Sequence, residues 1–235
     1  MTAPPDAPAT RGVFIAFEGG DGSGKSTQAR LLADRLRQEG QDVELTREPG
    51  GTDVGERLRS LVLDPAHAPI DAVTEALIFA AARSAHVRQL ILPALEAGRT
   101  VITDRYMDSS VAYQGAGRAL GPETVAGLNE WATGGLRPDL TVLLDADTTT
   151  AAGRRATREQ SPGGAGPDRL ESEPEAFHQS IRTAFTDRAK AHPDRYLVLD
   201  AGRDIPALAA EVWARVAGLL GAGADRTSPD AEAGR

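Results

Sequence analysis

The chain has 235 residues, of which 40% are hydrophobic and none is cysteine, and its formal net charge is −8. This length and composition allow one substantial core, so a single folded domain is expected, and the lack of cysteine excludes disulfides and thiolate metal sites. The acidic balance argues against a general nucleic-acid binder, which would present a basic surface, so no nucleic-acid partner is expected.

Residues 1–11 are expected to form a disordered tail, because they are rich in proline and alanine. They have neither the charged start nor the apolar stretch of a signal peptide. No apolar run in the chain approaches the roughly 20 residues that a membrane-spanning helix requires. We therefore expect a cytoplasmic protein that has no membrane partner.

A glycine-rich segment lies between an apolar run at residues 13–17, predicted to be a strand, and a helical pattern at residues 24–37. It matches the pattern G-x-x-x-x-G-K-[ST], the P-loop that wraps the terminal phosphates of a nucleotide. Lys25, one of two lysines in the chain, would reach the β- and γ-phosphates, and the Ser26 hydroxyl would ligate Mg²⁺. We predict ATP binding here rather than a merely structural turn, through Gly19, Gly20, Asp21, Gly22, Ser23, Gly24, Lys25, Ser26 and Thr27.

Four more short apolar segments are predicted to be strands, and helical patterns separate them. The strands are expected at residues 43–46, 100–103, 140–144 and 196–199. The helices are expected at residues 73–97, 122–132, 148–158, 174–191 and 205–220, with Pro93 bending or ending the first of these early. This alternation predicts the three-layer α/β fold of P-loop NTPases, with helices on both faces of a five-stranded parallel sheet. Residues 221–235 are expected to form a second disordered tail.

The segment at residues 159–169 interrupts the pattern between two helices. It contains three glycines and two prolines, and arginines border it. A plain surface loop could have this composition. Beside a P-loop, a mobile lid that covers the phosphates and spans about residues 154–171 is the favoured interpretation.

The residues after the third strand separate the classes of P-loop protein. A GTPase needs an Asn-Lys-x-Asp motif, and neither lysine lies in one. A motor ATPase places a catalytic acid after the strand-end aspartate, whereas Asp104 is followed here by Arg105. An arginine suits a second anionic substrate, which predicts phosphoryl transfer to a small phosphorylated acceptor. Asp104 occupies the position that usually helps to hold Mg²⁺, so Ser26 and Asp104 are the predicted metal ligands.

The chain resembles bacterial thymidylate kinases over residues 12–220, in segments that follow the order of the family. These segments are Phe17-Glu18-Gly19, Thr46-Arg47-Glu48-Pro49-Gly50-Gly51-Thr52, Phe79-Ala80-Ala81-Ala82-Arg83 followed by His86, Asp104-Arg105-Tyr106, and Ser109-Ser110-Val111-Ala112-Tyr113-Gln114-Gly115. The resemblance implies a homodimer that converts dTMP to dTDP with ATP and Mg²⁺.

The resemblance also implies roles in an acceptor pocket. Phe79 and Arg83 share one helix face, where the phenylalanine would stack on thymine and the arginine would donate to a base carbonyl. Gln114 would complete base recognition, and Tyr113 would lie near the sugar and favour deoxyribose. The other implied dTMP-binding residues are Glu48, Arg59 and Arg105 around the 5′-phosphate, and Ser109 and Ser110 along the nucleoside.

Other interpretations remain open at this point. Phe79 alone would be assigned to core packing, and Arg59 to a solvated helix position. A kinase for another deoxynucleotide and a non-catalytic nucleotide sensor with the same fold are the competing functions. The combination of Phe79, Arg83 and Gln114 favours thymine, and an intact P-loop lysine favours catalysis.

Catalysis is expected to require alignment and charge neutralisation more than a strong base, because the second pKa of a phosphate monoester is about 6. The expected catalytic residues are Lys25, Arg105 and Asp21. The P-loop lacks the additional arginine that some family members carry, so the lid is expected to supply one. The candidates are Arg154, Arg155, Arg158 and Arg169, of which Arg158 and Arg169 are favoured because they flank the mobile segment.

Overall fold

The computed structural model describes residues 11–67, 69–159 and 166–225, and its centre is a five-stranded sheet. The strand order is β2-β3-β1-β4-β5, and every neighbouring pair is parallel. The strands are β1 (Phe14–Glu18), β2 (Val43–Arg47), β3 (Thr100–Asp104), β4 (Leu140–Asp145) and β5 (Tyr196–Asp200). The predicted fold class is thereby confirmed, and each strand lies within one residue of its predicted limits.

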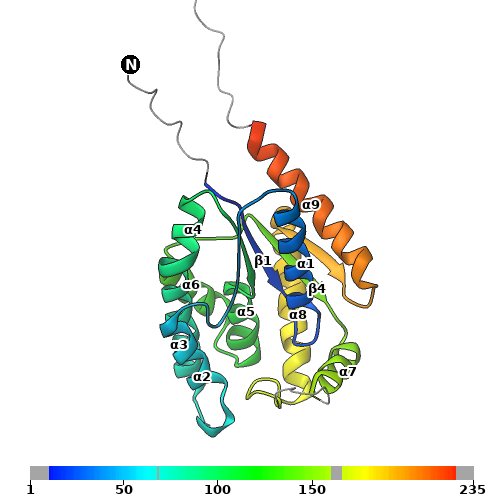
Figure 1. Cartoon of the computed structure of the whole chain (residues 1–235). Coiled ribbons are helices and arrows are strands. Elements are labelled where there is room, and N and C mark those ends of the chain that lie inside the picture. Colours follow the sequence, from blue (N-terminus) through cyan, green and yellow to red (C-terminus); the bar gives the residue numbers. More distant parts are fainter. Residues whose placement is uncertain (1–10, 68, 160–165, 226–235) are drawn as a thin grey trace, which may run out of the picture.

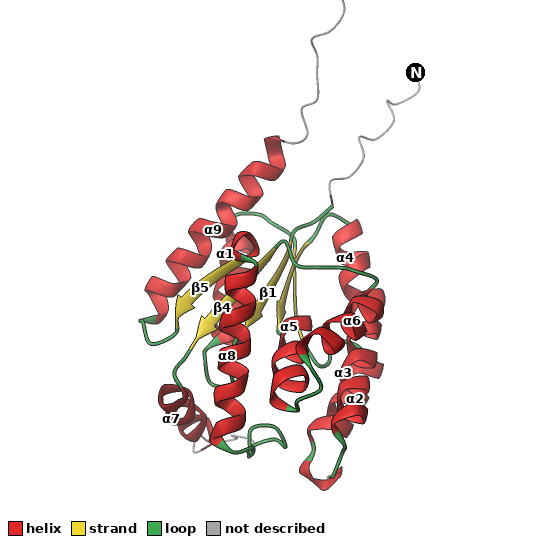
Figure 2. Ribbon diagram, turned by 180° about the vertical axis from the view of Figure 1, so that it is seen from behind, coloured by secondary structure: helices red, strands yellow, loops and turns green. Residues whose placement is uncertain are grey.

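Helices cover both faces of the sheet (Figures 1 and 2). The α-helices are α1 (Lys25–Gln38), α2 (Asp53–Leu63), α3 (Ala72–His86), α4 (Leu92–Glu96), α5 (Met107–Ser110), α6 (Pro122–Thr133), α7 (Thr148–Glu159), α8 (Glu175–Ala191) and α9 (Ile205–Asp225). Two π-helical segments, η2 (Val87–Ile91) and η3 (Val111–Gly117), and two short 3₁₀ turns, η1 (Pro65–His67) and η4 (Pro193–Arg195), complete the described elements.

The alternation of side chains along β1 divides the core into two layers. Ile15 and Phe17 pack with α1 and α9 on one face, whereas Phe14 and Ala16 pack on the other face against η2, α4 and α5. Strands with apolar side chains on both faces must be covered on both sides, which explains their unbroken apolar runs. No helix within the described ranges is long and apolar enough to cross a bilayer.

Two predicted features differ from the structure, and others lie outside the residues that it describes. Pro93 does not end the helical run, because it lies in the first turn of α4, directly after the wider π-helical turn η2, where a residue without an N–H is tolerated. Helix α9 continues to Asp225, so the predicted disorder of residues 221–225 is wrong; alanines at 222 and 224 favour helix there. Residues 1–10, 226–235 and 160–165, which include most of both predicted tails and the centre of the predicted lid, lie outside the described residues.

The parallel arrangement brings the carboxyl ends of all strands to one edge of the sheet (Figure 1). The P-loop follows β1, Glu48 follows β2, and Arg105 follows β3, and these three strands are neighbours in the sheet. Ligands of parallel α/β folds bind at this edge. The predicted ATP and acceptor residues therefore start from adjacent strand ends.

Candidate active site

The P-loop adopts a backbone that glycine alone accepts easily. Gly19, Gly22 and Gly24 have φ angles of 136°, 85° and 97°. A Cβ atom on Gly19 would lie 2.4 Å from the Leu144 carbonyl oxygen, so no larger residue fits. Because α1 begins at Lys25, the loop presents the N–H groups of a helix N-terminus to a bound anion.

The P-loop lysine is held inside this loop. Lys25 is 6% exposed, and its Nζ donates to the Gly20 carbonyl oxygen at 2.7 Å. Burial, together with the nearby Arg105 guanidinium, lowers the pKa of Lys25 to about 8. A buried ammonium group that lacks a full counter-charge is well matched to a polyphosphate.

The predicted metal ligands meet at the end of β3. Ser26 Oγ donates a short hydrogen bond to Asp104 Oδ2. Hydroxyl and carboxylate oxygens suit Mg²⁺, which keeps several waters and takes one or two carboxylates plus substrate phosphates. Within the described part of the chain, no three His, Cys, Asp or Glu side chains are grouped to hold a metal without a substrate. The donor set therefore fits a nucleotide-bound Mg²⁺ rather than a cation held by protein alone.

Arg105 connects the P-loop to the adjoining pocket. Its backbone is left-handed, with a φ of 73°, and its guanidinium donates to Asp21 Oδ1 (2.5 Å), Ser109 Oγ (2.9 Å) and the Tyr113 hydroxyl (3.0 Å). The Tyr113 hydroxyl donates in turn to Asp21 Oδ2 at 2.7 Å. Burial opposes ionisation of Asp21, but Arg105 and Lys25 hold the pKa of its carboxyl well below the usual range. Asp21 is therefore an anion that positions Arg105.

A buried carboxylate supports the turn that carries Arg105. Glu18 is fully buried, and its Oε1 accepts from the backbone N–H groups of Tyr106 (2.9 Å) and Ser109 (3.1 Å). Its Oε2 accepts from Ser109 Oγ at 2.6 Å. Burial, reinforced by the charge of Asp108, raises the pKa of Glu18 to about 7. This residue fixes the direction in which the chain leaves β3.

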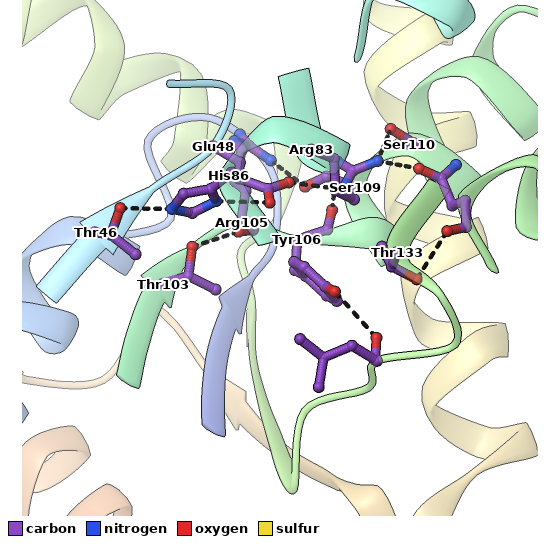
Figure 3. Close-up of polar contacts among 12 residues, drawn as sticks. Thr46, Glu48, Arg83, His86, Thr103, Arg105, Tyr106, Ser109, Ser110 and Thr133 are labelled. Carbon is purple, nitrogen blue, oxygen red and sulfur yellow. Dashed lines mark hydrogen bonds and ion pairs between the residues drawn. The ribbon is translucent and has the colours of Figure 1, made fainter. Parts of the chain in front are cut away.

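Arg83 lies at the centre of a buried polar network (Figure 3). It is 2% exposed and donates from Nε to Glu48 Oε2 (2.6 Å), from NH1 to Ser110 Oγ (2.9 Å) and Asn129 Oδ1, and from NH2 to the Tyr106 carbonyl (3.0 Å). A guanidinium has five N–H donors, and these contacts use four of them. Among the described residues, one hydrogen on NH2 of Arg83 has no partner, while the other contacts fix the position of the guanidinium.

His86, the last residue of α3, and Glu48, which follows β2, complete this network (Figure 3). Burial alone would raise the pKa of Glu48, but the Arg83 charge and the hydrogen bond with His86 lower it below the usual value. His86 Nδ1 lies 2.9 Å from Glu48 Oε1, and because that carboxylate only accepts, Nδ1 is the donor. His86 Nε2 is hydrogen-bonded to Thr46 Oγ1 at 2.7 Å. A buried hydrogen-bonded network of this kind holds its members in one geometry.

A cavity of about 500 Å³ runs from the P-loop to this network. Lys25, Ser26 and Asp104 line one part of it. All the residues predicted to bind dTMP also line it: Glu48, Arg59, Phe79, Arg83, Arg105, Ser109, Ser110, Tyr113 and Gln114. A space of this size, apolar in part and with convergent polar groups, is typical of a small-molecule site.

Comparison with known proteins identifies the family of the chain. Residues 17–212 match the family model described as thymidylate kinase. The chain is 49% identical to the thymidylate kinase of Cutibacterium acnes over 89% of its length and 98% of that protein, and 50% identical to that of Clavibacter sepedonicus over 91% and 98%. A crystal structure of thymidylate kinase from Ehrlichia chaffeensis has 33% identity and a TM-score of 0.70, and the match covers 88% of this chain and 99% of that one. The chain belongs to the thymidylate kinase family.

In this thymidylate kinase family member, the predicted lid arginines differ in their position relative to the P-loop. Arg154, on α7, donates to the carbonyl oxygens of Ser23 (3.4 Å) and Ala201 (2.8 Å) and lines the cavity beside the P-loop. Arg169 is turned away from the P-loop, because its Nε donates to the Val62 carbonyl (2.9 Å) and its NH2 to Glu75 Oε2 (2.6 Å). The side chains of Arg155 and Arg158 lie outside the described residues.

The sequence did not assign roles to several residues that shape this kinase-family site. Glu18, Glu75 and Asn129 are fully buried polar residues that hydrogen-bond to the predicted site residues. Glu18 stood within a family segment and at the end of a buried strand, which was an available signal. Glu75 and Asn129 lie on helices whose inner faces only the tertiary structure reveals.

Proposed function

We propose that this protein transfers the γ-phosphoryl group of ATP to the 5′-phosphate of dTMP, with Mg²⁺, and releases dTDP and ADP. The observation that carries the proposal is the continuous cavity, in which the P-loop lysine and a pocket containing Phe79, Arg83 and Gln114 face the same space, with Arg105 between them. A P-loop alone would support many reactions. The adjoining aromatic, guanidinium and amide groups specify a planar base with carbonyl oxygens.

The P-loop side of the cavity would hold the triphosphate. The loop N–H groups and Lys25 would bind the phosphate oxygens, and Ser26 and Asp104 would hold Mg²⁺. When bound, the metal would supply positive charge that offsets the negative charge of the triphosphate and of the transferring group. Arg154 is best placed among the described lid arginines to contact the nucleotide, because it already lies against the P-loop. Roles for Arg158 and Arg169 remain predictions.

The acceptor side would hold dTMP through its base, sugar and phosphate. Phe79 would stack on thymine, the free N–H of Arg83 would donate to a base carbonyl, and Gln114 would contact the base edge. Tyr113, tied to Asp21, would lie beside the sugar. The phosphate would contact Arg59 and Arg105, and Ser109 and Ser110 would line the nucleoside, while Glu48 holds Arg83 in place.

In the reaction, a dTMP phosphate oxygen attacks the γ-phosphorus as the bond to the β–γ bridging oxygen breaks, and ADP leaves with those electrons. The second pKa of the acceptor phosphate is about 6, so the attacking oxygen needs no strong base at neutral pH. Lys25, the loop N–H groups and Arg105 would neutralise charge on the transferring group. Asp21 would hold Arg105 in line, because their ion pair is short and partly buried.

We also propose that the protein is a cytoplasmic homodimer. Large hydrophobic side chains are exposed on the neighbouring helices α2, α3 and α6: Val54, Leu61, Val73, Leu77 and Trp131. Exposed large hydrophobic side chains on neighbouring helices are typical of a subunit interface. The three helices lie together at one side of the molecule (Figures 1 and 2).

ADP release measured with dTMP, dUMP, dCMP, dGMP and dAMP in parallel tests the proposed reaction. We expect the highest kcat/KM with dTMP. We expect Lys25→Ala to lower kcat by at least about a hundredfold, because the substitution removes the positive charge that neutralises the transferring group. A preference for a purine or cytosine nucleotide would contradict the substrate. ATP binding without turnover on any monophosphate would instead support the non-catalytic sensor. Arg154→Ala in the same assay checks the lid assignment through its kcat and its KM for ATP.

A further inference from the structure

A buried carboxylate joins the base pocket to Arg169, near the end of the predicted lid. Glu75 lies in the first turn of α3 and is fully buried. Its Oε1 accepts from Gln114 Nε2 (2.9 Å) and Arg118 Nε (3.3 Å), and its Oε2 accepts from Arg118 NH2 (3.2 Å) and Arg169 NH2 (2.6 Å). The two guanidinium groups hold the carboxylate in place: Arg169 contacts Oε2 alone, whereas Arg118 contacts both oxygens and shares Oε1 with Gln114.

This contact fixes the direction of the Gln114 amide. Gln114 is 1% exposed and lines the cavity with Phe79 and Arg83. An ionised carboxylate can only accept hydrogen bonds, so the Gln114 NH2 must point to Glu75. The amide oxygen is then the end of Gln114 that is left for a ligand in the cavity.

An oriented amide oxygen distinguishes between pyrimidines. Thymine and uracil carry a hydrogen on ring nitrogen N3 and can donate to this oxygen, whereas cytosine has a lone pair there and would face it with a second acceptor. A site built to hydrogen-bond one donor rejects an analogue without it strongly, because its buried polar group is left unpaired.

We propose that Glu75 is a positioning residue that sets the base specificity of the pocket. By holding the Gln114 NH2, it makes Gln114 an acceptor for N3–H of the base and so favours dTMP over dCMP. This inference rests on the proposed function, and it concerns how the same site selects its acceptor.

Glu75→Gln reverses the hydrogen-bond polarity with almost no change in shape. Arg169 lies 2.6 Å from Oε2 and Arg118 also donates to it, so the oxygen of the new amide stays on that side. The new NH2 then takes the place of Oε1 and faces Gln114, and the Arg118 Nε–H, which donates to Oε1 at 3.3 Å, loses that acceptor. Gln114 turns its oxygen toward that NH2 and its own NH2 toward the cavity, where it opposes the N3–H of thymine.

The test measures kcat/KM for dTMP and for dCMP with the full chain. We expect Glu75→Gln to reduce the dTMP-to-dCMP ratio at least about tenfold, mainly through a higher KM for dTMP. The matched control is Arg118→Met, which removes another partner of Glu75 but keeps the carboxylate, its contact with Gln114 and the packing of a long side chain on Phe177. We expect the ratio in this control to stay within about twofold of wild type.

Two further variants separate positioning from folding. The double variant Glu75→Gln/Arg118→Met removes one positive charge together with the negative charge of Glu75. We expect it to show the same fall in the dTMP-to-dCMP ratio as Glu75→Gln. In a Gln114→Leu background, Glu75→Gln should leave the ratio unchanged, because the two residues act as one unit. Folding of each variant is checked by circular dichroism.

An unchanged ratio in folded Glu75→Gln, or an equal loss of kcat with both nucleotides, would overturn the inference and leave the proposed reaction standing. Loss of folded structure in both the single and the charge-balanced variant would also overturn it, since Glu75 would then serve stability. A wild-type protein that does not phosphorylate dTMP would overturn the proposed function instead.

Discussion

Glu18 ends β1 with a carboxylate that holds the turn after β3. The backbone N–H groups of Tyr106 and Ser109 and the Ser109 hydroxyl all donate to it. Arg105 lies directly before Tyr106 and has a positive φ of 73°, a conformation that costs free energy in a residue with a side chain. The hydrogen bonds to Glu18 therefore stabilise the backbone that aims Arg105 at the cavity.

The burial of Glu18 predicts a pH dependence of stability. Its pKa is about 7 in the folded protein and 4.5 in its ordinary state, so the folded state binds the proton more tightly. The stabilisation is fully present below pH 4.5 and is lost as the pH rises through 7. We expect the free energy of unfolding of wild type, relative to Glu18→Gln, to fall by up to about 3 kcal/mol between pH 4.5 and 7.5. Urea unfolding of the unliganded wild type and Glu18→Gln across this pH range measures the difference. Parallel pH profiles of the two free energies of unfolding would contradict the prediction.

The sequence could predict the residues that line the cavity better than the residues that support them. Phe79, Arg83 and Gln114 lie in short segments with a fixed spacing, and the structure places all of them on one cavity. Glu18 acts on Ser109, 91 residues away, and Glu75 acts on Gln114, 39 residues away. Such pairings arise from tertiary packing, so no local pattern of residues carries them.

At the scale of elements, the buried strands were predictable and the irregular helices were not. Strands covered on both faces need continuous apolar residues, and this requirement is visible in the sequence. Helix α2 buries only Gly55 and Val62 and exposes Val54 and Leu61, and no helix was predicted there from the sequence. The π-helical segment η3 departs from the 3.6-residue period on which a helical pattern depends. Because η3 carries Tyr113 and Gln114, its irregular turn also sets the shape of the acceptor pocket.

The close approach of η3 to α8 depends on a glycine. A Cβ on Gly117 would lie 2.6 Å from Cε2 of the buried Phe177 ring, which packs edge-on against Tyr113. We expect Gly117→Ala to lower the free energy of unfolding by about 1–3 kcal/mol, because the ring must move within a packed core.

Gly127→Ala is the matched control for this substitution. Gly127 lies on α6, and no heavy atom of the described chain lies within 4 Å of an added Cβ there. Alanine should raise the free energy of unfolding by about 0.5–1 kcal/mol, since it favours helix and costs no space. Urea denaturation of both variants measures their free energies of unfolding. Equal values would contradict the prediction, because they would show that the Phe177 ring moves without a free-energy cost.

At the scale of the whole molecule, α3 connects the acceptor pocket to the outer surface. Phe79 and Arg83 face the cavity from one side of this helix, and Val73 and Leu77, which are also one turn apart, are 56% and 52% exposed. Helix α3 packs between α2 and α6, which expose Val54, Leu61 and Trp131 (Figure 1). A partner subunit bound to this side would therefore restrain the helix that carries Phe79 and Arg83, the proposed base-binding residues.

Leu77→Glu tests this link between assembly and binding. In a symmetric dimer the same patch meets itself, so the substitution places two negative charges in one apolar interface. We expect the dimer dissociation constant in sedimentation velocity to rise at least about a hundredfold, and the KM for dTMP to rise while kcat with saturating dTMP changes less. Val198→Glu is the control, because Val198 is also half exposed, at 49%, but lies on β5 at the opposite edge of the sheet from β2. An unchanged association state in Leu77→Glu, or equal dissociation in both variants, would place the interface elsewhere. Dissociation without any change in the KM for dTMP would show that α3 keeps its site geometry without a partner.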